Sequence, residues 1–213
     1  MPMLRLRQVF AAAVAALFVS MPALAGPPLL CFPFDIGGAK SLSVGAGGWH
    51  AIDARYDATR LVDDTLALLT PSTPIVVRME TLRRATLYAA KDADRAKTLL
   101  DRLQQRATIA GANSALAVFD FGYLVETYKQ GAYAFKPPIA TPKDIDGYSL
   151  VEKAAALSGD PRMEFALAVM TRDRTRGAAT YQTHLERTLE AARSDPSIQA
   201  NLVKQFGEDV TAR

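Results

Sequence analysis

Apolar residues recur every three or four positions through most of the chain beyond residue 57, and this spacing constrains the fold more than any other feature. Leu61, Val62, Leu66 and Leu69 show it first, and MEFALAVM (163–170) repeats it more densely. Side chains at these intervals lie on one face of an α-helix. The pattern predicts an all-α fold of seven or eight helices, with no convincing strand outside residues 30–50.

Aspartate, proline and glycine mark where the predicted helices begin and end. Asp57 is a candidate N-cap, Thr73-Pro74 provides an N-cap and a first-turn proline, and Asp160-Pro161 and Asp195-Pro196 do the same later in the chain. A helix over 115–130 is apolar nearly all round, which is typical of a buried position, and Gly131 is expected to end it. Three prolines then predict an internal loop over 131–147.

Aspartates 35 residues apart suggest repeated helical hairpins: Asp57 and Asp92 form one such pair, and Asp160 and Asp195 form another. The segment 75–109 resembles a tetratricopeptide repeat, whose period is about 34 residues. The second-helix residues come one place early, and the closing proline is missing. The resemblance implies antiparallel helical hairpins in an array, which presents a concave surface for a protein or peptide. The residues that carry it are Ala85 and Tyr88 on the first helix and Ala96, Leu100 and Leu103 on the second.

The first 25 residues read as an export signal. Arg5 and Arg7 precede the apolar stretch 9–19, and Ala23-Leu24-Ala25 supplies the small residues that a signal peptidase requires, so cleavage is expected before Gly26. The apolar stretch is short for a membrane span of about 20 residues. The sequence therefore predicts a periplasmic or secreted protein, with a retained anchor as the alternative.

Charge and cysteine content narrow the function further. Removing 25 residues from 213 leaves 188, in which 23 Lys and Arg residues face 22 Asp and Glu residues. A near-neutral chain lacks the positive field that attracts nucleic acid. No later segment is long and apolar enough for a bilayer span, and a single cysteine excludes an intramolecular disulfide. We expect neither a nucleic-acid partner nor a transmembrane span after signal removal.

Residues 26–56 differ from the rest of the chain and are predicted to form an extended, glycine-rich strap. Apolar side chains such as Phe34, Leu42 and Trp49 are spaced through flexible backbone, an arrangement suited to filling grooves between helices. The sequence thus divides into a signal peptide (1–25), the strap (26–56) and a helical domain (57–213).

The strap also contains residue types that could form a thiol active site. Cys31, His50 and Asp53 could act as nucleophile, base and orienting acid. However, Phe-Pro-Phe follows Cys31, rather than a helix N-terminus or a cationic cluster that would lower its pKa. A buried cysteine is the interpretation we prefer. An exported thiol enzyme and a structural envelope component bridged through Cys31 are the alternatives.

Neither a cofactor nor a metal is predicted. Gly45-x-Gly47-Gly48 lacks the third glycine and the strand–helix context of a nucleotide-binding loop. The two histidines, His50 and His184, are not at ligand spacing, and Asp53, Asp57, Asp63 and Asp64 lack the order of a calcium loop.

The preferred hypothesis is an exported, non-catalytic helical scaffold that binds a protein or peptide. Aromatic side chains beside the proline-rich loop could form a partner-binding patch. Arginines in the turn 172–177 could form a weak anion site. The candidate partner-binding residues are Tyr128, Tyr133, Phe135, Arg172, Arg174 and Arg176.

Overall fold

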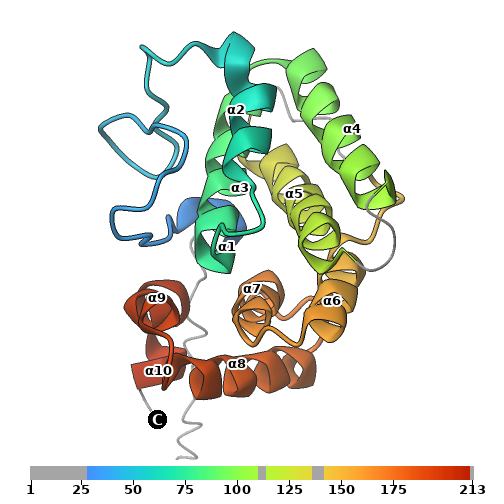
Figure 1. Ribbon diagram of the computed structural model, residues 1–213. Helices are drawn as coiled ribbons and strands as arrows, with labels where there is room; N and C mark the ends of the chain where they lie inside the picture. Colours follow the sequence, from blue (N-terminus) through green and yellow to red (C-terminus); the bar gives the residue numbers. More distant parts are fainter. Residues whose placement is uncertain (1–27, 110–113, 136–141, 212–213) are drawn as a thin grey trace, which may run out of the picture.

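The computed structural model describes residues 28–109, 114–135 and 142–211 of the 213-residue chain. Within these ranges the protein is built from helices joined by turns and irregular segments, with no strand, and the predicted all-α class is confirmed (Figure 1). The predicted signal peptide lies outside the described residues. In chain order the helices are α1 (Pro28–Cys31), the 3₁₀ helix η1 (Ala58–Arg60), α2 (Leu61–Leu68), α3 (Ile75–Ala89), α4 (Ala93–Ile109), α5 (Ala115–Ala134), α6 (Gly147–Ser158), α7 (Arg162–Thr171), α8 (Ala178–Ala192), α9 (Pro196–Phe206) and α10 (Glu208–Thr211).

Aspartate side chains close several helix N-termini, as the sequence predicts. Asp57 accepts a hydrogen bond from the Thr59 amide at the start of η1, and Asp195 accepts bonds from two amides in the first turn of α9. Before α7, Asp160 accepts a bond from the Arg162 amide, but the N-cap is Pro161, one residue later than expected. These caps satisfy backbone donors that have no partner within the helix. At α3 the boundary is one residue later than expected, because Pro74 is the N-cap rather than the first helical residue.

Helix α5 is central and packs against α3, α4 and α6 (Figure 1). Its apolar character on nearly all sides is explained by this position, and Phe119, Tyr123 and Leu124 are completely buried. The backbones of α5 and α6 meet at Gly122 and Gly147. A Cβ atom added to Gly122 would lie 2.7 Å from the Gly147 carbonyl oxygen. Side chains at either glycine would hold the two helices apart.

The internal loop is shorter than the sequence predicts, and Gly131 does not end α5. The helix continues to Ala134, where the Phe135 amide donates to the Gly131 carbonyl oxygen. Gly131 is buried, and contacts with the rest of the core outweigh its helix penalty of about 1 kcal/mol. Helix α6 begins at Gly147, after the Asp146 cap. Residues 136–141 of the predicted loop lie outside the described residues.

Helix α7 is the buried element of the C-terminal half and contacts α3, α6, α8 and α9. The Phe165 ring on α7 packs edge-on against Phe34, at 5.9 Å between ring centroids, and against Phe206 of α9, at 5.8 Å. Residues from the beginning, middle and end of the chain therefore share one core.

Residues 32–57 connect α1 to η1 without forming a helix and run beside α2 and α3 (Figure 1). Phe34 and Leu42 are each 3% exposed. The Asp35 amide donates to Asn201 Oδ1 (2.7 Å), and Gln205 Nε2 donates to the Phe32 carbonyl oxygen (2.9 Å). This segment therefore contacts both α3 and α9. Among the described helices, none has the length and apolar character needed to cross a membrane.

Candidate functional site

A cleft lies between residues 39–43 and helix α2. Its volume is about 620 Å³, enough for a peptide segment or a small ligand. The turn between α2 and α3 forms its end. Hydroxyl groups and apolar side chains alternate on its walls: Ser41, Ser43, Tyr56, Thr70, Ser72 and Thr73 supply the hydroxyls, and Leu42, Ala67, Leu68, Pro74 and Val77 supply the apolar surface.

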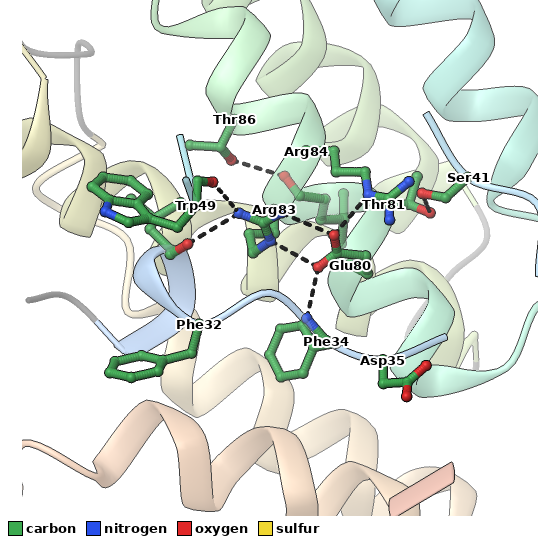
Figure 2. A network of polar contacts seen from close by, with 12 residues as sticks. Phe32, Phe34, Asp35, Ser41, Trp49, Glu80, Thr81, Arg83, Arg84 and Thr86 are labelled. Carbon is green, nitrogen blue, oxygen red and sulfur yellow. Dashed lines mark hydrogen bonds and ion pairs between the residues drawn. The ribbon is translucent and has the colours of Figure 1, made fainter. Parts of the chain in front are cut away.

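Buried charges on α3 hold the wall formed by residues 39–43 in place. Glu80, Arg83 and Arg84 follow one another at helical spacing, so their side chains project toward the same side (Figure 2). Glu80 Oε2 accepts a hydrogen bond from the Phe34 amide (3.0 Å). Arg84 Nη1 donates to the Leu42 carbonyl oxygen (2.6 Å).

Arg83 binds two further backbone carbonyl groups of the N-terminal segment. Its Nη1 donates to the carbonyl oxygens of Leu30 (3.1 Å) and Trp49 (2.9 Å). Figure 2 shows Trp49 beside the guanidinium. Tyr88 continues the series one turn along α3, where its hydroxyl donates to the Ser43 carbonyl oxygen (3.0 Å) and accepts from the Asp53 amide (3.0 Å). Backbone groups of an irregular segment are thus paired by side chains instead of by a sheet.

Hydrogen bonds within the charge cluster on α3 keep Glu80 ionised. Glu80 is 1% exposed, and the loss of solvation alone would raise the pKa of its carboxyl. The hydrogen bonds and positive charges of Arg83 and Arg84 outweigh that effect and lower the pKa below its usual value. Glu80 is consequently ionised at neutral pH. The cluster is a structural support for the cleft wall rather than a reactive group.

The opposite wall is held by a polar network on α2. The Tyr56 hydroxyl donates to Asp64 Oδ2 (2.9 Å), and Arg60 Nη2 donates to Asp64 Oδ1 (3.0 Å). The Thr73 hydroxyl donates to the Leu68 carbonyl oxygen (2.6 Å) at the end of α2. Both walls are thus fixed by hydrogen bonds.

The three residues of the hypothetical thiol site make separate contacts in the structure. Cys31 is half-buried, and desolvation raises the pKa of its thiol although the charge of Arg83 opposes this. His50 is exposed, and its ring lies edge-on to Trp49, at 5.2 Å between centroids. Asp53 accepts hydrogen bonds from the backbone and side chain of Arg55. Among the described residues no hydrogen bond joins Cys31, His50 and Asp53, and the effect of burial on the pKa of the Cys31 thiol exceeds that of Arg83.

The aromatic residues proposed for a partner-binding patch do not share a surface. Tyr128 is completely buried, and its hydroxyl donates to the Ala96 carbonyl oxygen (3.1 Å), so its assignment to an exposed patch is wrong. Tyr133 is 88% exposed on the last turn of α5. Phe135 is half-buried and lies 6.2 Å from Trp49 between ring centroids. Only Tyr133 is left as an exposed aromatic side chain at this position.

The three arginines after α7 bind three different places, so they do not form a common anion site. Arg172 is 8% exposed and its guanidinium lies over the Phe32 ring at 4.4 Å. Arg174 pairs with Asp209 (3.3 Å), and Arg176 pairs with Asp146 (2.6 Å). Their alternation along the turn directs the side chains to different parts of the fold.

A second polar cluster, which the sequence analysis did not single out as a group, joins α6, α7 and α8. His184 Nδ1 lies 2.7 Å from Glu164 Oε2, and His184 Nε2 lies 2.8 Å from the Tyr148 hydroxyl. His184 is 4% exposed. This buried bridge holds three helices together.

Sequence reasoning also missed the buried charges of α3. The spacing of Glu80, Arg83 and Arg84 is visible in the sequence, but it is also the spacing of exposed helix ion pairs. What distinguishes them is that their remaining partners come from residues 30–49, far away in the chain. Within the described ranges no three His, Cys, Asp or Glu side chains gather as a metal site would require. No protein-family model, no curated protein and no solved structure matches the chain.

Proposed function

We propose that the protein is an exported, non-catalytic helical scaffold that binds a protein or peptide partner, and that an extended segment of this partner occupies the cleft beside residues 39–43. The observation that carries the proposal is the run of non-helical backbone at residues 40–43 along one wall of the cleft. Its neighbours at either end are paired: the Ala39 amide donates to the Ile36 carbonyl oxygen and the Gly45 amide to the Ala51 carbonyl oxygen. Among the described residues, the amides of residues 40–43 donate to no protein acceptor.

An extended peptide supplies the carbonyl oxygens that such amides require. Main-chain pairing of this kind gives affinity, and side-chain pockets give specificity. The walls of the cleft carry hydroxyl and apolar side chains together with Lys40, Arg60 and Asp64, so the cleft suits a peptide with both polar and apolar side chains. Its walls are already fixed by Arg84, Tyr88 and Asp64, which reduces the entropy lost on binding.

The wider proposal includes the array of tetratricopeptide-like hairpins and the export signal at residues 1–25. Helices α3 and α4 support the hairpin arrangement, since they have 15 and 17 residues and contact each other after a short turn. Arrays of helical hairpins commonly bind proteins and peptides. Export would present the cleft to partners outside the cytoplasm.

Panning a displayed peptide library against the immobilised protein tests this proposal. Ala67 is exposed on α2 and lines the cleft, so Ala67→Trp fills the cleft without disturbing the core. We expect selected peptides to bind this variant at least ten times more weakly, as measured by fluorescence polarisation. Ala156→Trp is the matched control, because Ala156 is an exposed alanine on α6. Equal binding by the two variants, or no peptide selected above background, would refute the proposal.

A further inference from the structure

A second cavity, of about 320 Å³, lies where α5 begins. It shares no lining residue with the cleft beside residues 39–43. Helix α3 contributes Arg78, α4 contributes Arg106, and the first two turns of α5 contribute Ser114, its N-cap, and Asp120. Leu69 and Pro71 close the apolar side. Positive and negative side chains therefore face one small space.

Asp120 is the unusual member of this group. Its side chain is 2% exposed, and Oδ2 accepts a hydrogen bond from Arg78 Nη1 (2.6 Å). Oδ1 is buried and has no hydrogen-bond partner among the described residues. A buried carboxylate oxygen normally accepts a hydrogen bond, and Asp120 lines the cavity, so its unpaired oxygen indicates a missing donor.

The rest of the cavity wall offers hydrogen-bond donors. Arg106 gives two of its five N–H groups to the carbonyl oxygens of Leu66 and Leu69, which leaves three for a ligand. The Ser114 hydroxyl makes no hydrogen bond among the described residues, and the first amides of α5 have no acceptor within the helix. The positive end of the helix dipole adds to these donors. This wall suits an anion.

We propose that this cavity binds hydrogenphosphate, a tetrahedral oxyanion that retains one proton. Its unprotonated oxygens accept hydrogen bonds from Arg106, Ser114 and the first turn of α5. Its P–OH group donates to Asp120 Oδ1 and so supplies the donor that this oxygen lacks. Sulfate has the same shape but no proton at neutral pH, so its oxygen would face the carboxylate as a second acceptor.

The protonation of Asp120 makes the discrimination depend on pH. Burial raises the pKa of its carboxyl to about 6, although Arg78 from α3 and Arg106 from α4, the charged groups facing it, act in the opposite direction. At about pH 8 the carboxylate is ionised and can only accept a hydrogen bond. At about pH 5 it carries a proton and can donate to either anion, so the preference for phosphate should then disappear.

Isothermal titration calorimetry of the protein, produced from its full-length sequence, measures this preference. At about pH 8 and matched ionic strength we expect inorganic phosphate to bind at least ten times more tightly than sulfate, the value of one hydrogen bond to a charged group. Glycerol 3-phosphate forms a third arm. Its phosphate ester carries no P–OH group at about pH 8, so we expect it to bind at least ten times more weakly than inorganic phosphate, and equal affinity would overturn the proposed hydrogen bond to Asp120.

Three variants separate this site from general charge effects. Asp120→Asn should bring the ratio of the phosphate and sulfate dissociation constants close to 1, and Arg106→Gln should weaken both at least tenfold. Arg102→Gln is the matched control, since Arg102 is exposed one turn earlier on α4 and lies outside the cavity. Circular dichroism establishes whether each variant is folded. Equal affinity of the unmodified protein for the two anions at about pH 8, no phosphate binding at millimolar concentration, or equal effects of Arg106→Gln and Arg102→Gln would overturn the proposal.

Discussion

At the scale of single residues, this protein is marked by charged side chains in its core. Glu80 and Asp120 are both nearly inaccessible to solvent, yet their pKa values move in opposite directions. Glu80 receives four hydrogen bonds, from Phe34, Arg83 and Arg84, which stabilise its charged form. Asp120 receives one, from Arg78. The number of hydrogen-bond donors around each carboxylate therefore decides whether its pKa is raised by burial or lowered by its partners.

The raised pKa of Asp120, about 6, predicts a specific dependence of stability on pH. Because the folded protein binds this proton more tightly than the unfolded chain does, the contribution of Asp120 to stability is greatest below the unfolded pKa of about 3.9 and is lost as pH rises through about 6. Relative to Asp120→Asn, the free energy of unfolding should fall by about 2 kcal/mol between pH 4 and pH 7.

Urea unfolding of both proteins at several pH values, in buffers free of phosphate, measures this difference. Other carboxyl groups titrate in both proteins and cancel in the comparison. A difference that stays constant would show that Arg78 cancels the effect of burial on the Asp120 pKa, and one that increases with pH would show that Arg78 lowers this pKa more than burial raises it.

At the scale of elements, the contact between α5 and α6 depends on two glycines from separate parts of the chain. Gly122 lies within α5, where a glycine destabilises the helix by about 1 kcal/mol relative to alanine. It is nevertheless required, because the backbone of α6 passes directly over it at Gly147. At Gly122 the low helix propensity of glycine is outweighed by the close packing of α5 against α6.

Gly122→Ala should therefore destabilise the protein, although alanine is the better helix former. The new Cβ atom would lie 2.7 Å from both the Gly147 carbonyl oxygen and the Leu150 Cβ atom, so the helices must separate. We expect the free energy of unfolding to fall by about 1–3 kcal/mol, as for other overpacked sites. Gly38→Ala is the control, since nothing lies within 4 Å of the added atom, and it should change stability by less than about 0.5 kcal/mol. A Gly122→Ala variant as stable as the unchanged protein in urea would disprove this account of the crossing.

The difference between local sequence preferences and contacts with distant segments explains which elements could be predicted from the sequence. The helices and the caps at Asp57 and Asp195 depend on residues a few positions apart, so local patterns were sufficient. The end of α5 was placed too early because the burial that sustains the helix past Gly131 comes from distant segments. For the same reason the cleft could not be predicted, because its wall is held by Glu80 bonding to Phe34, 46 residues away.

At the scale of the whole molecule, residues 32–57 connect parts of the chain that are far apart in sequence. The Asp35–Asn201 and Phe32–Gln205 hydrogen bonds join residues separated by 166 and 173 positions. Phe34 lies in the same region and packs against Phe165 of α7. Closing such long loops costs conformational entropy, which burial of the aromatic side chains must offset.

Phe34→Ala tests whether this segment belongs to the common core. Removing a ring that is 3% exposed should lower the free energy of unfolding by about 3–5 kcal/mol and the melting temperature by about 10 °C. Val44→Ala, at a side chain that is 44% exposed in the same segment, is the control and should change the melting temperature little. Two probes decide the interpretation, since Trp49 fluorescence reports on the segment and far-ultraviolet circular dichroism reports on the helices.

If residues 32–57 and the helices form one cooperative unit, both signals change at the same temperature in the unchanged protein and move down together in Phe34→Ala. If the segment were only an appendage, the variant would lose the Trp49 signal first while the helices unfolded at their original temperature. That second outcome would also argue against a fixed wall for the peptide cleft. Residues 39–43 form this wall, and the bond from Arg84 on α3 to Leu42 holds it only while the segment is packed on the helices.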